Sequence, residues 1–417
     1  MNDAQHVQRG DTATPASPSG AESVAFTPGR INGLELRNRV IKTATYEGMC
    51  PGGLPSQALT DHHVELARGG VGMTTVAYCA VSPRGRTFAD QMAMSEALVP
   101  HLRRLTDAVH EAGAAVSIQL GHCGGFSKNT EMSRPHPLGP SRGLNHYGML
   151  SGLVFTTPMS AADIDDVVRE FADAARLAKE SGFDAVELHL GHGYLLSQWL
   201  SPATNRRRDE HGGSLENRLR LPLAVVAAVR EAVGPDFPIL AKANLTDGFR
   251  GGATVDDAVT IAQALERGGV DALVMSGGFV SRTPLFLLRG GRPLKGMIEV
   301  EKKWAQKAAL AVFGPVVVRK VPFEELFFLE EARRVRAAVS MPLVLLGGVI
   351  SRAGLATAMR EGFEFVAMGR ALIADPAFVN EMRAGRLERT RCNQCNECMV
   401  EMDRGGVRCV LDALVRV

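Results

Sequence analysis

Several features that would assign this chain to a common class are missing from its sequence. The formal net charge is only +2 over 417 residues, so no bias toward nucleic acid or an anionic membrane surface is expected. No run of roughly eighteen apolar residues occurs, so we expect no membrane span. The N-terminus has no apolar segment of the kind that directs export. A Gly-x-Gly-x-x-Gly fingerprint after the first expected strand is also absent, which counts against an open dinucleotide-binding sheet.

Cysteine is sparse, and the low number of cysteines indicates the redox state of the compartment in which the protein resides. Seven cysteines in a chain of this length do not form the dense framework of a disulfide-stabilised protein. A reducing compartment is therefore expected, and the cytoplasm is the default localisation. Residues 1–23 are rich in Ser, Thr, Pro, Ala and Asp without periodicity, and predict a disordered tail.

Strand and helix patterns alternate along the rest of the chain. The apolar strand candidates are Arg39–Thr43, Gly72–Ala77, Ala114–Leu120, Ala185–Leu188, Ile239–Ala243, Ala272–Met275, Leu343–Leu346 and Phe365–Met368. Amphipathic helical patterns lie between them, as at Pro100–Ala112, Ile164–Ser181, Leu215–Val233, Val255–Arg267 and Arg352–Glu361. Strands that are each followed by a helix predict an α/β fold of the (β/α)₈ (TIM) barrel type over residues 24–390. Periodicity alone leaves an open doubly wound sheet as the alternative.

Chemically active side chains gather at the end of the fourth expected strand. His189, His192 and Tyr194 directly follow the apolar run Ala185–Leu188. In a barrel, the carboxyl ends of the strands carry the chemistry, so these residues place two hydrogen-bond donors and one proton source around one small volume. The structural alternative is that the histidines only cap the strand and that Tyr194 is a core tyrosine with a bonded hydroxyl.

A second pattern indicates an anion site after the seventh and eighth expected strands. Gly347 and Gly348 offer backbone N–H groups, Ser351 begins a helix, and Gly369-Arg370 adds a basic residue. This is where phosphate groups bind in many barrels of this type.

The C-terminal extension, residues 391–417, contains a third pattern. Cys392, Cys395 and Cys398 have Cys-x-x-Cys-x-x-Cys spacing, and Cys409 follows as a fourth thiol. Such spacing is typical of an iron–sulfur cluster or, less often, of zinc. The alternative is that these thiols bind nothing and pack against the barrel.

The block around His189 resembles the signature of the Old Yellow Enzyme family, the NAD(P)H:flavin oxidoreductases that include the 2,4-dienoyl-CoA reductases. The matching residues are His189, His192, Gly193, Tyr194, Leu195, Ser201, Pro202, Asn205, Arg207, Asp209, Gly212, Gly213, Ser214, Asn217 and Arg218. The resemblance extends from about Phe26 to about Gly385 and implies the barrel fold.

The resemblance also implies a flavin mononucleotide (FMN) cofactor and residues that hold it. Gly347, Gly348, Gly369 and Arg370 look like the family's phosphate segments. Gln119 resembles the glutamine at the pyrimidine edge of the flavin ring, and Lys242 occupies the slot of a basic residue near N1 and O2. Ala44 and Thr45 fall where the family contacts the C4a and N5 side of the ring.

Three segments depart from the family pattern. Lys242 stands where many relatives have Arg, which keeps the charge but loses the planar fork. Residues 43–46 replace the usual Pro-Met or Pro-Leu, and residues 122–125 lack the arginine of the common His-x-Gly-Arg.

The reaction that the resemblance implies is reduction of an activated C=C bond in an α,β-unsaturated carbonyl compound. His189 and His192 would hold the carbonyl oxygen, the hydride would come from flavin N5, and Tyr194 would supply the proton. The reductant is expected to be NADH or NADPH, which the sequence does not distinguish, and the protein is expected to be a homo-oligomer acting on a small molecule.

Two other functions stay open at this stage. One is an iron–sulfur flavoprotein of the dienoyl-CoA reductase or amine dehydrogenase type, in which a [4Fe–4S] cluster exchanges electrons with a partner. The other is a non-catalytic barrel that binds flavin or phosphate. A long loop at 278–298 is expected to be either a substrate lid or an oligomer contact, and the helical pattern in 299–340 indicates packing or assembly.

Overall fold

The computed structural model describes residues 20–132 and 134–411. Most of the expected tail, residues 1–23, therefore lies outside the described residues. Residues 21–23 are described and belong to helix α1 (Ala21–Val24), although the sequence predicted disorder up to residue 23.

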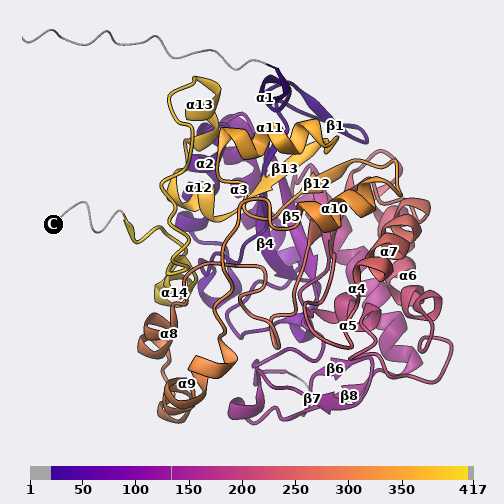
Figure 1. Ribbon diagram of the computed structural model, residues 1–417. Coiled ribbons are helices and arrows are strands. Elements are labelled where there is room, and N and C mark those ends of the chain that lie inside the picture. The colour runs from indigo at the N-terminus through magenta and orange to yellow at the C-terminus, as the bar shows by residue number, and fades with distance from the viewer. Residues whose placement is uncertain (1–19, 133, 412–417) are drawn as a thin grey trace, which may run out of the picture.

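Parallel strands close into a barrel at the centre of the molecule (Figure 1). In chain order they are β3 (Val40–Lys42), β4 (Met73–Ala80), β5 (Ala115–Gly121), β9 (Ala185–Leu190), β10 (Ile239–Asn244), β11 (Ala272–Ser276), β12 (Leu343–Leu345) and β13 (Phe365–Met368). Each expected strand is present, and the pairing of β13 with β3 closes the barrel. The (β/α)₈ expectation is confirmed, and the open sheet is excluded.

One strand boundary differs from expectation in a way that matters for the site. Strand β9 continues to Leu190, so His189 belongs to the strand instead of following it. It pairs in register with Lys242 of β10. The backbone hydrogen bonds of the sheet therefore fix the position of His189.

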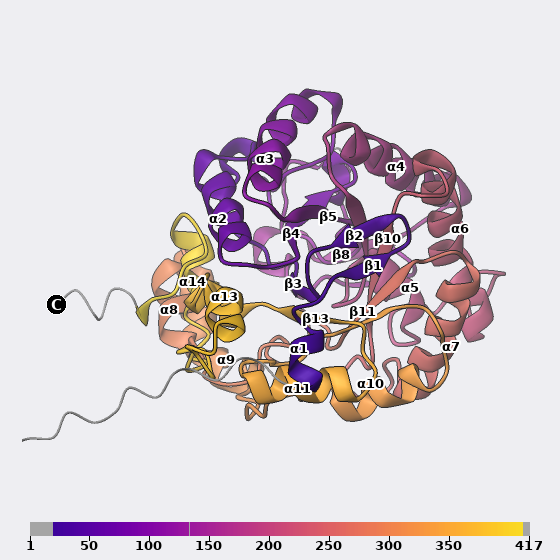
Figure 2. The same ribbon diagram turned by 90° about the horizontal axis from the view of Figure 1, so that it is seen from above.

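Helices surround the barrel, as the view along its axis shows (Figure 2). The outer ring contains α2 (Gln57–Arg68), α3 (Val99–Glu111), α4 (Ala161–Glu180), α6 (Leu215–Val233), α7 (Val255–Arg267), α10 (Leu329–Arg336) and α11 (Arg352–Arg360). The five helices expected above are confirmed, and their ends differ from the expected ones by at most three residues. Capping boxes begin two of them: Ser160 with Asp163 at α4, and Thr254 with Asp257 at α7.

The amino-terminal end of the barrel is closed by a hairpin. Strands β1 (Gly29–Ile31) and β2 (Leu34–Leu36) pair antiparallel and lie across this end (Figure 2). Ile31 and Leu36 are buried in the cluster that fills the barrel interior. A larger apolar cluster packs between the strands and the helices. Chemistry is therefore confined to the opposite end.

Inserted segments cover that opposite, carboxyl end. A small sheet of β6 (Leu138–Gly139), β7 (Gly143–Leu144) and β8 (Phe155–Pro158) lies there, at the bottom of Figure 1. The long connection after β11 forms α8 (Leu294–Val300) and α9 (Trp304–Val317), and the C-terminal segment with α14 (Cys398–Glu401) packs beside α8. The short helices α5 (Leu195–Leu200), α12 (Arg370–Ala374) and α13 (Phe378–Arg383) complete the α-helices of the described residues.

Among residues 20–132 and 134–411, no helix is both long and apolar enough to cross a bilayer.

Candidate active site

The structure brings the three expected catalytic residues together at the carboxyl end of β9. The ring centroid of His189 lies 5.0 Å from that of His192 and 4.6 Å from that of Tyr194. His189 is buried, and its Nδ1 atom has no hydrogen-bond partner among the described residues. A buried imidazole nitrogen without a partner is costly unless a ligand completes it.

His192 is held by residues of the next two strands. Its backbone N–H donates to Oδ1 of Asn244 at 3.0 Å, and its ring Nε2 lies 2.7 Å from the hydroxyl oxygen of Ser276. The backbone of His192 is left-handed, with φ 61°, and Gly193 follows with φ 80°. A Cβ atom at Gly193 would lie 2.4 Å from the Phe279 ring. The tight turn therefore needs glycine, and it delivers Tyr194 to the start of α5.

Both histidines are neutral at physiological pH. Burial lowers the pKa of His192 to about 3, with a smaller contribution from the positive charge of Lys242. Burial also lowers the pKa of His189 well below its usual value, and His192 and Lys242 add to the effect. A neutral imidazole has one N–H donor and one acceptor nitrogen, so each ring can donate one hydrogen bond to a substrate oxygen.

Tyr194 keeps its proton, and a second tyrosine lies next to it. Burial raises the pKa of Tyr194, so the phenol is a proton donor over the whole neutral range. The Tyr78 ring lies 5.1 Å from the Tyr194 ring, and its hydroxyl donates to the carbonyl of Gly85 at 2.9 Å. Sequence reasoning missed Tyr78 because β4 extends beyond the expected end at Ala77.

A buried ionic network lies on the strands next to the histidines. Oε1 of Glu187 accepts from Nε2 of Gln119 at 2.7 Å and lies 2.9 Å from Nζ of Lys242. Nζ of Lys242 also donates to the hydroxyl of Thr43 at 3.0 Å. Glu187 was not among the expected site residues, because it lies inside an apolar strand. Glu187 lies two positions before His189 on β9, so both side chains point to the same face of the strand. This spacing was the available signal that Glu187 belongs to the site.

These residues fit the ring end of a flavin. Lys242 supplies a cation and Gln119 an amide, a donor set that suits the oxygen and nitrogen edge of a pyrimidine. Their strand ends lie beside His189, whose Nδ1 lacks a partner. Thr45 lies nearby: a Cβ atom at Gly369 would be 3.2 Å from Thr43 and 3.7 Å from the Thr45 hydroxyl. The segment 43–45, which includes Ala44, therefore lies between Lys242, at the expected position of the flavin ring, and Gly369, which follows β13.

The glycines expected at the phosphate end have the backbone that a close approach requires. Gly347 and Gly348 have φ 132° and 80°. The rings of Phe323 and Phe327 lie against Gly348, within 2.8–2.9 Å of where its Cβ atom would be. Arg370 donates to the carbonyl of Arg289 at 2.9 Å and to Oδ1 of Asn396 at 2.5 Å.

The N-terminus of α11 does not meet the expectation of an open phosphate site. Oε1 of Glu325 accepts from the N–H of Ile350 at 3.0 Å and from the hydroxyl of Ser351 at 2.8 Å. A carboxylate of the chain itself therefore occupies this helix end. Gly347, Gly348, Gly369 and Arg370 therefore stay a prediction as the residues that hold a flavin phosphate.

The four C-terminal cysteines share one neighbourhood with Arg370. Burial raises the pKa of Cys398 to about 12, Arg370 opposes this, and the thiols of Cys392, Cys395 and Cys409 add to it. Within the described part of the chain, no three or more His, Cys, Asp or Glu side chains are arranged to hold a metal ion. The thiols are close enough to affect one another but, as they lie, do not form a coordination site.

Comparisons with known proteins show to which family this chain is similar. The family described as "NADH:flavin oxidoreductase / NADH oxidase family" matches residues 25–280. The 4,4'-dithiodibutanoate disulfide reductase of Rhodococcus erythropolis is 45% identical over 94% of this chain and 96% of its own length. The metal reductase of Desulforamulus reducens is 32% identical over 94% of this chain, which spans 54% of that longer relative.

A solved structure supports the fold. The Old Yellow Enzyme homologue from Zymomonas mobilis superposes with a TM-score of 0.68, covering 89% of this chain and 95% of that one at 21% identity. At this identity the likeness concerns the fold alone.

Proposed function

The chain belongs to the NADH:flavin oxidoreductase / NADH oxidase family, and from this premise we propose that it uses NADH or NADPH, through FMN, to reduce an activated C=C bond. The family match confirms the sequence resemblance stated above, and the protein is an oxidoreductase. Membership of a family with named reductases counts against a non-catalytic flavin-binding barrel. The observation that carries the proposal is the convergence of two neutral imidazoles and one protonated phenol at the end of β9.

Each residue of this cluster has a separate task. FMN, when bound, supplies the hydride chemistry. His189 and His192 donate hydrogen bonds to the carbonyl oxygen of the acceptor, where negative charge develops. Donors of this kind contribute on the order of 3 kcal/mol each to lowering the barrier. Tyr194 delivers its proton to the α-carbon, because burial keeps the phenol protonated. Lys242 and Gln119 orient the cofactor from the neighbouring strands.

The two half-reactions test these assignments separately. In anaerobic stopped-flow experiments, Tyr194→Phe should slow reoxidation of the reduced protein by 2-cyclohexenone by about a hundredfold or more. Reduction of the same variant by NADH should be unchanged, because no proton from Tyr194 is needed. His189→Ala should also slow the oxidative half-reaction.

Tyr78→Phe is the matched control, since its hydroxyl is already engaged with the Gly85 carbonyl. It should reduce the enone at close to the wild-type rate. Wild-type rates in both Tyr194→Phe and His189→Ala would refute the assigned roles.

A second candidate acceptor is a small disulfide. The observation in its favour is the 45% identity to a protein named for reduction of 4,4'-dithiodibutanoate. That compound, offered in place of 2-cyclohexenone in the same assay, tests the candidate directly. A higher kcat/KM for the disulfide than for any enone would make it the better description of the acceptor.

Electron exchange through an iron–sulfur cluster is a further proposal. The spacing of Cys392, Cys395 and Cys398, with Cys409 as a fourth thiol, favours it, and binding would require these side chains to move from their arrangement in the described residues. Protein purified without oxygen should be assayed for FMN, iron and sulfide. Stoichiometric iron and sulfide beside FMN would support it, and FMN alone would leave the thiols structural.

We also propose that the protein self-associates through α9. Trp304, Phe313 and Val316 on this helix are 83%, 63% and 64% exposed, which is unusual for large apolar side chains in one place. Light scattering after size-exclusion chromatography should show an oligomer that Phe313→Glu dissociates. A wild-type monomer would contradict the proposal.

Cytoplasmic localisation is proposed on the state of the cysteines. Cys50, Cys79, Cys123, Cys392, Cys395 and Cys398 are free thiols in the structure, and the first three of them are buried. Thiol titration of the native and unfolded protein should find no disulfide. A disulfide in protein isolated from its own cells would oppose this localisation.

A further inference from the structure

A cavity of about 420 Å³ lies between the small β6–β8–β7 sheet and the mouth of the barrel. This volume is in the range of small-molecule sites. Gly193 lines its inner side, directly before Tyr194 in the chain. Phe126, another lining residue, packs edge-on against the Tyr194 ring at 5.6 Å. The cavity is therefore adjacent to the catalytic cluster, and a substrate held at Tyr194 would extend into it.

The outer wall of the cavity carries positive charge from three separate segments. Arg142 precedes β7, Arg206 follows α5, and Arg282 follows β11. In residues 20–132 and 134–411, none of the three forms an ion pair with a carboxylate. No acidic residue is among those that line the cavity in this part of the chain. The wall is cationic without an internal counter-charge.

Aromatic rings and backbone carbonyls hold these guanidinium groups instead of carboxylates. Arg142 lies over the Phe155 ring at 5.9 Å, and Nη2 of Arg206 donates to the carbonyl of Arg142 at 2.6 Å. Arg282 lies over the Phe249 ring at 4.7 Å. Such contacts orient a guanidinium group but leave its charge for a bound anion.

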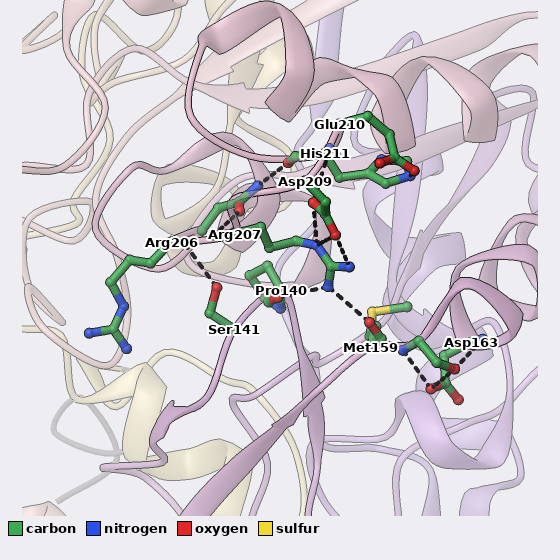
Figure 3. A network of polar contacts seen from close by, with 11 residues as sticks. Pro140, Ser141, Met159, Asp163, Arg206, Arg207, Asp209, Glu210 and His211 are labelled. Carbon is green, nitrogen blue, oxygen red and sulfur yellow. Dashed lines mark hydrogen bonds and ion pairs between the residues drawn. The ribbon is translucent and has the colours of Figure 1, made fainter.

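The neighbouring Arg207 shows what a structural arginine looks like in the same loop. It is bonded to Asp209 at 2.5–3.0 Å and donates to the carbonyls of Pro140 at 3.1 Å and Met159 at 2.8 Å (Figure 3). The backbone N–H of Arg206 donates to the hydroxyl of Ser141 at 2.9 Å, while its side chain points away from this network (Figure 3). These hydrogen bonds hold the backbone of the loop in place, and the side chain of Arg206 projects from this loop.

The floor of the cavity is tied to the catalytic turn by one side chain. Gln198 accepts from the N–H of Gly125 at 2.9 Å and donates to the carbonyl of Gly193 at 2.7 Å. Phe126 and Phe279 supply apolar surface near Tyr194. The cavity is thus apolar at its inner end and cationic at its outer end, which suits a molecule with an apolar body and an anionic tail.

We propose that this cavity is a subsite for a carboxylate on the acceptor substrate, bound by Arg142, Arg206 and Arg282. The inference rests on the proposed function and narrows it: the acceptor is an anionic molecule whose reducible bond lies at Tyr194. Guanidinium groups bind carboxylate and phosphate with the same fork geometry. The phosphates of NADH are therefore the other source of a matching anion, and the test separates the two.

The experiment uses cyclohex-2-enones that carry an acetate, propanoate or butanoate tail, each compared with its own methyl ester. For at least one tail length, the FMN-loaded wild type should have a KM for the acid about tenfold below that for the ester. Arg142→Gln, Arg206→Gln and Arg282→Gln should each raise the KM of that acid by about tenfold and leave the ester unchanged. The rate of flavin reduction by NADH should not change in any variant.

Arg208→Gln is the matched control, because Arg208 is exposed in the same loop and does not line the cavity. It should behave as wild type. Equal KM values for acid and ester in the wild type at every tail length would overturn the subsite. So would arginine variants that raise only the KM for NADH, since the cavity would then bind the reductant.

The subsite and the proposed function fail in different ways. If the neutral esters are reduced but the charge makes no difference, the function stands and the subsite is wrong. If no enone is reduced, the function is wrong, and the subsite is decided by binding alone. The saturated cyclohexanone acid, titrated while flavin absorbance is recorded, should then bind the wild type and lose affinity about tenfold in Arg206→Gln. Equal affinity in both proteins would overturn it.

Discussion

Lys242 and Glu187 form an ion pair inside the barrel, with Nζ 2.9 Å from Oε1 and both side chains nearly inaccessible to solvent. The same carboxylate oxygen accepts a hydrogen bond from Gln119. One buried acid therefore orients both residues assigned to the flavin ring. Burial lowers the pKa of Lys242, and Glu187 opposes that effect.

Replacing Glu187 with Gln should strongly destabilise the protein. The substitution leaves Lys242 buried without its partner, and breaking a buried pair from one side costs about 3–5 kcal/mol of unfolding free energy. Urea unfolding, followed by circular dichroism, measures the effect. Glu180→Gln removes the partner of Arg176 on the surface of α4 and should cause no measurable change. Similar midpoints for both variants would show that the buried pair does not stabilise the fold.

Removing the hydroxyl of Ser276 should impair catalysis through His192. This hydroxyl lies 2.7 Å from Nε2 of His192 and selects which ring nitrogen carries the proton. Ser276→Ala should therefore lower the rate of enone reduction by about tenfold, the effect of one hydrogen bond. Ser276→Thr should restore it.

Ser117→Ala is the control for this position, because it removes another buried hydroxyl, bonded to Thr75 at 2.9 Å. It should cost stability without changing the rate of enone reduction. Equal rate losses in Ser117→Ala and Ser276→Ala would assign Ser276 a structural role only.

The sequence allowed the barrel and the core of the site to be predicted because both depend on local patterns. The strands are short apolar runs, and His189, His192 and Tyr194 lie within six consecutive residues. Glu187 could not be predicted in its role. Its partner Gln119 is 68 positions away in the chain, and only the pairing of β5 with β9 brings them together.

The phosphate end shows the same limit. Gly347 and Gly348 are recognisable as glycines that permit a tight turn. That Glu325 caps the following helix and that Phe323 lies on Gly348 depends on how the insertion after β11 folds back. Long insertions carry weak periodicity, so their contacts cannot be read from the sequence.

The rate of enone reduction should be independent of pH between about 5.5 and 9.5. His192 has a pKa of about 3 and His189 one well below 6.5, so neither gains a proton in this range. Burial raises the pKa of Tyr194, so the phenol does not lose its proton either. Single-turnover reoxidation by 2-cyclohexenone, measured across this range, should give a flat profile. A limb with an apparent pKa near 6.5 would mean that a histidine titrates during the reaction.

Acid should destabilise the folded protein below about pH 6.5, before most carboxylates are protonated. Burial depresses the pKa of His63, His122, His189 and His192 in the folded state. In the unfolded chain these imidazoles bind a proton near pH 6.5. As the pH falls below that value, the unfolded state gains protons that the folded state does not, until the pH approaches the depressed pKa values, which are about 3 for His122 and His192. Each imidazole contributes up to about 1.4 kcal/mol per pH unit over this window.

His122→Gln tests this dependence, because Nδ1 of His122 accepts from the N–H of Gly124 at 2.9 Å and a glutamine oxygen can replace it. Urea midpoints measured from pH 7.5 to 4.5 should fall less steeply in this variant than in the wild type, by up to one bound proton. A wild-type urea midpoint that stayed constant down to pH 4.5 would contradict this prediction. Any acid destabilisation at lower pH would then be due to carboxylates and not to the buried histidines.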